Sequence, residues 1–225
     1  MNAKLLADTM ITSGSQLFSR KKASERLASR GIQICDVRTA MDLMACLAFL
    51  TRAASTRNVI CNFSPHESKL EDIAGYSSLE DGEASYTVYV PGISTNLSKA
   101  WERIPCMDGR GKPIGTFEDW PNPTLEELLI AVAVHEVRHL LQDFISAEYG
   151  KKSRSQRLRG AIEYVGLLFE EERNGWLKEE RSSEFIERRT NQREFEARVI
   201  EMLSLIDVHS GTTAQKLVRL LKIKV

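Results

Sequence analysis

Two histidines and a glutamate stand at a spacing that suits metal-assisted hydrolysis. Residues 135–139 read HEVRH, which is an HExxH pattern. On an α-helix, positions four apart lie one turn above each other, so both imidazoles can reach one zinc ion at about 2.0 to 2.1 Å. Glu136 lies on the neighbouring edge of the same face and can take a proton from a water molecule without binding the ion. We therefore predict His135 and His139 as Zn²⁺ ligands and Glu136 as the general base.

A catalytic zinc site also needs a third protein ligand and one open position. Metzincins supply a histidine six residues after the second one, but this chain has Ile145 there and has Gln142 where a glycine is expected, which excludes that family. The remaining common ligand is a carboxylate from a later helix. The chain offers two such carboxylates in the sequence NQREFEA at residues 191–197.

In these two segments the sequence resembles the gluzincins, in which HExxH is followed by a helix reading E-x-x-A. The resemblance covers mainly residues 124–146 and 191–204. It implies that Glu194 is the third zinc ligand, with Glu196 as the alternative, and that the small Ala197 lets the two helices approach closely. It also implies a zinc metallopeptidase that hydrolyses peptide bonds in a protein or peptide substrate.

The chain departs from the gluzincin pattern at one position. Many of these families place an aspartate four residues after the ligand glutamate to orient a histidine, whereas Arg198 stands there. The orienting carboxylate must then come from elsewhere, and Asp143 and Glu201 are the candidates. The mechanism also needs a donor for the tetrahedral oxyanion. Its candidates are His209, Tyr164 and Arg193.

Other functions remain open. The chain could be a catalytically inactive zincin-like binding protein, with His66 or a cysteine closing the metal site as a fourth ligand. It could instead bind nucleic acid through the basic side chains Lys151, Lys152, Arg154, Arg157 and Arg159. Acidic residues follow that cluster and no aromatic residues interleave it, so a solvated surface is the favoured interpretation.

The elements that must position these residues are mostly helical. Thr124 and Glu127 form a capping box, and no glycine or proline interrupts the next twenty residues, so the motif lies on a helix from Thr124 to about Ser146. The pattern predicts further helices over residues 13–30, 39–54, 155–172, 182–189, 192–206 and 213–221. Residues 58–63 and 84–90 have the β-branched or alternating character of strands. Residues 68–82 read as a polar connection and residues 96–123 as a long surface loop.

This order of elements is typical of an α+β protein. We expect a single zincin-like domain over residues 1–225, made of a helical part (1–57), the strands with the HExxH helix (58–146) and a largely helical part (147–225). By the resemblance, a small mixed or antiparallel sheet packs against the active-site helix. The strand from Ala84 to Val90 is expected to be its edge strand, which would hold an extended substrate.

The amino-acid composition limits the partners and the cellular compartment that we expect. Lysine plus arginine and aspartate plus glutamate both count 31, so no global field favours a nucleic-acid or membrane partner. No apolar run approaches the about 20 residues of a membrane span. Cysteines 35, 46, 61 and 106 show no CxxC spacing and read as reduced thiols, and the first residues do not resemble a secretory signal. We therefore expect a soluble, cytoplasmic protein, with its oligomeric state open.

Overall fold

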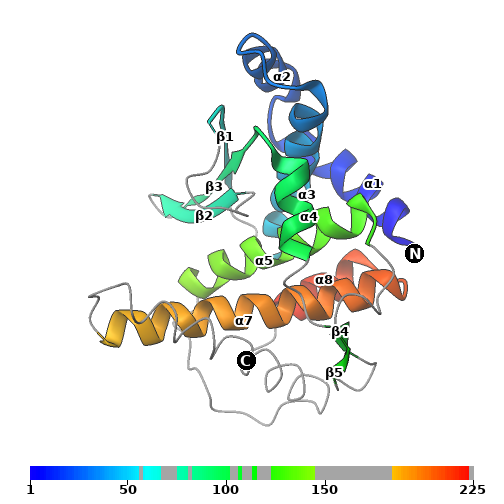
Figure 1. Cartoon of the computed structure of the whole chain (residues 1–225), viewed down its shortest axis with the longest axis vertical. Helices are drawn as coiled ribbons and strands as arrows, with labels where there is room; N and C mark the ends of the chain where they lie inside the picture. The colour runs from blue at the N-terminus through cyan, green and yellow to red at the C-terminus, as the bar shows by residue number, and fades with distance from the viewer. Residues whose placement is uncertain are drawn as a thin grey trace.

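Helices make up most of the chain, with a small sheet packed against them (Figure 1). The computed structural model describes residues 1–55, 58–66, 75–80, 83–101, 106–107, 113–115, 123–144 and 184–222. For residues 75–80, 98–101, 106–107, 113–115, 143–144 and 184–195 the description covers the backbone alone. In the broad sense the fold is α+β, as predicted. The proposed division of residues 1–225 into three parts stays a prediction.

The N-terminal region forms two helices where the sequence predicted one. Helix α1 (Ala3–Gly14) begins after Asn2, whose side chain accepts a hydrogen bond from the amide of Leu5. A single 3₁₀ turn (Ser15–Leu17) follows, and the extended Phe18 then separates it from α2 (Arg20–Ala28), which Ser19 caps. The predicted start of this helix at Ser13 or Ser15 was therefore wrong. Its predicted stop was right, because Gly31 takes a positive φ of 75° after α2.

Helix α3 (Ile34–Ser55) is longer than its predicted range of residues 39–54 and forms the buried centre of the N-terminal region. Helix α1 crosses it closely at Gly14, where an added Cβ would collide with the carbonyl oxygen of Ala45. Glycine is required there because the two backbones touch.

The sheet has three strands in the order β1-β3-β2. Strands β1 (Val59–Ser64) and β3 (Glu83–Tyr89) confirm the two predicted strands and pair in parallel, with Val59 opposite Ala84. Strand β2 (Gly75–Glu80) pairs antiparallel with β3 and lies within the segment predicted as a polar connection. Residues 84–90, expected as an edge strand, therefore form the central strand and its end. Tyr86, Val88 and Val90 are buried, so their side chains belong to the core.

Part of the predicted loop over residues 96–123 is ordered structure. Helix α4 (Ile93–Trp101) follows the turn at Gly92, and strands β4 (Cys106–Met107) and β5 (Pro113–Gly115) form a short antiparallel pair. The rest of that range lies outside the described residues, as do the predicted helix over residues 155–172 and the basic cluster at 151–159.

Helix α5 (Leu125–Phe144) carries the HExxH motif and confirms the predicted helix. Its capping box is present: the amide of Thr124 donates to Glu127 Oε2 over 2.8 Å, and the amide of Glu127 donates to Thr124 Oγ1 over 3.3 Å. These two bonds satisfy amides that the first helical turn leaves unpaired. The start of α5 is therefore fixed by local sequence.

Two further helices complete the described chain. Helix α7 (Glu184–His209) is continuous, although the sequence predicted separate helices over residues 182–189 and 192–206. Helix α8 (Ala214–Leu221) begins after Thr213, whose side chain accepts from the amide of Lys216.

Helix α5 lies in the middle of the molecule, between α3 and α7, and also contacts β2 (Figure 1). Its core side chains include Ile130, Ala133, Val134, Val137 and Leu140, each with no exposed surface. Burial of a large aliphatic side chain stabilises a fold by roughly 1.5 to 3 kcal/mol, so this helix is held firmly. Among the described helices, none combines the length and apolar character required to cross a bilayer.

Candidate metal centre

The two histidines of the motif converge in space. The Nε2 atoms of His135 and His139 lie 3.0 Å apart, and the rings meet edge to face with centroids 4.7 Å apart. Two nitrogen ligands of one tetrahedral zinc ion, each about 2.0 to 2.1 Å from it, stand about 3.3 Å apart. A shift of a few tenths of an ångström would therefore let both rings bind a single ion.

A carboxylate stands behind His135. Glu201 Oε2 lies 2.9 Å from His135 Nδ1, and the glutamate side chain is 1% exposed. The same oxygen accepts a hydrogen bond of 2.9 Å from Arg198 Nη1. Glu201, one of the two predicted orienting carboxylates, is therefore the group that contacts the first histidine. Arg198, which replaces the aspartate of the gluzincin pattern, holds that carboxylate in place.

An amide stands behind His139. Gln142 Oε1 lies 3.1 Å from His139 Nδ1, and Gln142 Nε2 donates to Glu196 Oε2 over 2.8 Å. Because a carboxylate only accepts hydrogen bonds, the Gln142 nitrogen must face Glu196 and its oxygen must face the imidazole. His139 then donates from Nδ1.

Glu196 is also paired with a buried guanidinium. Arg138, on the metal helix, contacts Glu196 Oε1 and donates to the carbonyl oxygen of Leu221 at the end of α8. Arg138 is 5% exposed and Glu196 is 2% exposed. The alternative third ligand, Glu196, is thus engaged by Arg138 and Gln142. In this structure Glu196 contacts the histidines only indirectly, through Gln142.

The contacts of the Nδ1 atoms bear on which nitrogen of each ring carries the proton. A neutral imidazole carries one proton, and the Gln142 oxygen places the proton of His139 on Nδ1, whereas the Glu201 carboxylate lies 2.9 Å from His135 Nδ1 as an ion-pair contact outside hydrogen-bond geometry. The two Nε2 atoms face each other across 3.0 Å, a separation at which one ring can donate to the other or both can bind one metal ion.

Glu136 follows His135 on α5 and is half-buried. Burial raises the pKa of Tyr86 on β3 far above its usual value; a hydrogen bond from Thr51 lowers it, and the negative charge of Glu136 raises it. The hydroxyl oxygens of Tyr86 and Thr51 are 2.6 Å apart. Tyr86 is therefore a neutral core residue that feels the charge of the predicted general base.

The other predicted site residues are distributed as follows. The backbone of Glu194 belongs to α7, but its side chain lies outside the described residues, as do the side chains of Asp143, Tyr164 and Arg193. His209 Nδ1 lies 3.0 Å from Glu127 Oε1, at the opposite end of α5 from His139, so it is not an oxyanion donor at this site. His66 is exposed near the end of β1. Among the described side chains, no group of three histidine, cysteine, aspartate or glutamate residues could hold a metal ion.

Sequence reasoning missed the pairing of Arg138 with Glu196. A signal for it exists, because both charges fall on the apolar faces of their helices, where an unpaired charge would be very costly. A charge on each of two facing apolar stripes predicts a buried pair.

The chain was compared with known protein families, curated proteins and solved structures. No protein-family model, no curated protein and no solved structure matches this chain.

Proposed function

We propose that this protein is a zinc-dependent metallopeptidase with a zincin-like fold. The observation that carries the proposal is the pair of Nε2 atoms, 3.0 Å apart, with the Nδ1 atom of each ring beside an oxygen acceptor. Histidines that bind metal in proteins characteristically donate their second ring nitrogen to a carboxylate or carbonyl oxygen. His139 has that arrangement toward Gln142, and the Glu201 carboxylate lies 2.9 Å from Nδ1 of His135.

Glu194 is the proposed third ligand. Helices α5 and α7 run antiparallel, because Glu127 contacts His209, His135 contacts Glu201 and Gln142 contacts Glu196. Position 194 precedes Glu201 by seven residues, which is nearly two turns on the same side of α7. Its backbone is therefore level with the last turn of α5, at or just beyond Gln142. Ala197, between positions 194 and 201, has no exposed surface, as close approach of the two helices requires.

In the proposed reaction His135, His139 and Glu194 would hold the ion. Zinc supplies Lewis-acid chemistry, which polarises a carbonyl and lowers the pKa of water. Glu136 removes a proton from the attacking water and returns it to the leaving nitrogen. Glu201 and Gln142 keep the two rings in the orientation and tautomer that binding requires. Strand β2, which contacts α5 at one edge of the sheet, would hold an extended substrate in place of the strand that the sequence suggested.

The decisive experiment combines metal analysis with one substitution. We expect purified protein to carry about one zinc per chain, as a site of this ligand type binds. Glu136→Gln should retain the metal while hydrolysis of a casein or peptide-library substrate falls by at least about a hundredfold. Protein that contains no zinc and keeps the same hydrolysis after Glu136→Gln would refute the proposal.

A second candidate is a catalytically inactive zincin-like binding protein. The observation that favours it is the 3.0 Å separation of the two Nε2 atoms, at which one imidazole can donate a hydrogen bond to the other without a metal. That hydrogen bond would then replace the metal. Zinc-free protein whose thermal stability does not change when zinc is added would support this candidate.

A further inference from the structure

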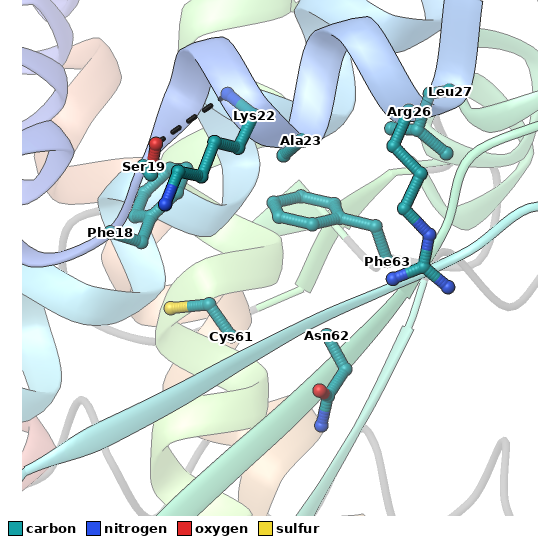
Figure 2. A pocket seen from close by; sticks show the side chains of 9 residues that line it. All are labelled: Phe18, Ser19, Lys22, Ala23, Arg26, Leu27, Cys61, Asn62 and Phe63. Atoms are coloured by element: carbon teal, nitrogen blue, oxygen red, sulfur yellow. Dashed lines mark hydrogen bonds between the residues drawn. The ribbon is translucent and has the colours of Figure 1, made fainter. Parts of the chain in front are cut away.

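A groove lies between helix α2 and strand β1 (Figure 2). Its volume is about 390 Å³. Strand β1 is at the opposite edge of the sheet from β2, the strand that contacts the metal helix. The groove is lined by Phe18, Ser19, Lys22, Ala23, Arg26, Leu27, Cys61, Asn62 and Phe63.

The groove combines an apolar base with a positively charged rim. The rings of Phe18 and Phe63 pack at a tilt with centroids 5.8 Å apart, and Leu27 of α2 is buried. Lys22 and Arg26 are exposed and stand one turn apart on α2. None of the nine lining residues is acidic. Burial raises the pKa of Cys61 to about 12, so its thiol is neutral as well. The groove therefore favours a ligand that is both apolar and negatively charged.

One side of the groove is the hydrogen-bonding edge of a strand. The groove is lined by three consecutive residues of β1, which is the strand at one edge of the sheet, and the Asn62 amide donates to Ser85 Oγ on β3. The carbonyl oxygens of Asn58 and Ser64 accept from Ala84 and Val90, which places the backbone groups of even-numbered residues toward β3. The backbone groups of the odd-numbered residues then point away from β3, toward the outer edge of the sheet. Such an edge pairs readily with another extended chain.

We propose that this groove binds an acidic peptide segment in extended conformation, as an additional strand alongside β1. An apolar side chain of the peptide packs against Phe18 and Phe63, and flanking carboxylates pair with Lys22 and Arg26. Main-chain bonds to a strand edge supply affinity in this mode, and the side-chain pocket supplies specificity. The site does not involve zinc or Glu136, so it stands whether or not the proposed peptidase activity does.

Single-stranded nucleic acid would also be attracted by the two cations, but the aromatic rings favour a peptide. Bases stack on aromatic side chains whose faces are open. Phe18 and Phe63 are half-buried, pack against each other and contact the hydrophobic core. A groove whose base is formed by such packed rings fits an aliphatic or aromatic side chain, and a nucleic acid has no backbone group that continues a sheet.

Fluorescence anisotropy with a labelled peptide tests the proposal. The probe is about seven residues long, a typical strand length, and alternates glutamate with valine around a central phenylalanine. It is titrated with full-length protein that carries Glu136→Gln, so that peptidase activity does not consume it. We expect saturable binding that weakens at least about tenfold when Lys22→Glu and Arg26→Glu are combined.

The chain offers a matched control on the same helix. Lys21 is exposed on α2, lies 4.0 Å from Glu25 and does not line the groove. Lys21→Glu should change the affinity by less than about twofold, since an exposed pair contributes little. A probe with proline at alternate positions should also bind poorly, because proline cannot donate to a strand.

Three results would overturn the proposal. The first is the absence of saturable probe binding below about 1 mM. The second is equal affinity of the double variant and the parent protein. The third is a thymidine oligonucleotide that binds and depends on Lys22 and Arg26 while the peptide does not, which would make the groove a nucleic-acid site.

Discussion

The side-chain oxygen of Gln142 lies 3.1 Å from the Nδ1 atom of His139, and the nitrogen of the same amide donates to Glu196. One glutamine thus links a metal-binding candidate on α5 to a carboxylate on α7. The acceptor-only chemistry of Glu196 fixes the orientation of the amide, and the amide then fixes the tautomer of the imidazole. The state of His139 is therefore set by residues that do not contact the metal position.

Gln142→Ala should weaken zinc binding while the fold persists. The substitution removes the acceptor that keeps the His139 proton on Nδ1, and loss of such a group typically costs about 10- to 100-fold in metal affinity. Glu201→Gln should have an effect of similar size through His135. Competition with a chromogenic chelator measures both affinities.

Asp207→Asn is the matched control for Glu201→Gln. Asp207 is another buried carboxylate of α7, but it pairs with Lys216 at 3.1 Å. Its substitution should leave zinc affinity unchanged. If all three variants bound zinc like the parent protein, the two groups would have no role in orienting the histidines.

Removal of Glu194 should impair zinc binding, whereas removal of Glu196 should reduce the stability of the fold. Glu196→Ala leaves the buried Arg138 without its carboxylate, and breaking a buried pair in this way costs roughly 3 to 5 kcal/mol of unfolding free energy. Glu194→Ala should abolish zinc binding while leaving the zinc-free protein nearly as stable as the parent. Chemical denaturation in the presence of a chelator, together with metal analysis, measures the two effects.

The opposite pattern would reassign the third ligand. If Glu196→Ala lost the metal without loss of stability in the zinc-free form, Glu196 would be the ligand and its contact with Arg138 would not hold in solution.

Zinc should stabilise the folded protein through the histidine pair. A ligand present at about a hundred times its dissociation constant adds about 2.7 kcal/mol to the unfolding free energy. We expect the melting temperature of chelator-treated protein to rise when zinc is added. His135→Ala should remove this rise, whereas His66→Ala, at an exposed position near the end of β1, should retain it. Differential scanning fluorimetry gives both results, and an equal rise in the two variants would contradict the assignment.

Stability should decline at alkaline pH. Burial raises the pKa of Cys61 from 9.0 to about 12 and raises that of Cys46 further, so the folded protein keeps both protons after the unfolded chain has lost them. The unfolding free energy should therefore fall as the pH rises above 9. Urea denaturation at a series of pH values tests this expectation. Cys46→Ala and Cys61→Ala together should make the decline shallower, and Cys35→Ala, at an exposed thiol, should not.

The sequence predicted the motif helix well because its signals are local. The capping box at Thr124 and Glu127 and the uninterrupted apolar pattern belong to one segment, and both are present in the structure. Strand β2 was missed because its sequence, GYSSLE, contains no β-branched residue, and it is paired only through its neighbour β3. The central place of residues 84–90 in the sheet follows from that pairing. No pattern within β3 itself could predict it.

The support of the two histidines was only partly predictable. Helix spacing brings His135 and His139 together, and that prediction needed no tertiary information. Glu201 could be named only as one of two candidates, since its choice depends on how α7 lies against α5. The same antiparallel packing gives Glu196 to Arg138 and Gln142, and residues more than fifty positions apart leave no periodic signal of such a contact.

The bond from Arg138 to the carbonyl oxygen of Leu221 joins the last turn of α8 to the helix that bears the motif. A carbonyl at a helix C-terminus carries partial negative charge, so it shares with Glu196 the task of neutralising this guanidinium. Shortening the protein by its final helix would leave Arg138 with less compensation and would loosen Glu196 and Gln142 in turn. Helix α8 thus stabilises the two histidines indirectly. Its loss would first be detected as a lower affinity for the metal ion.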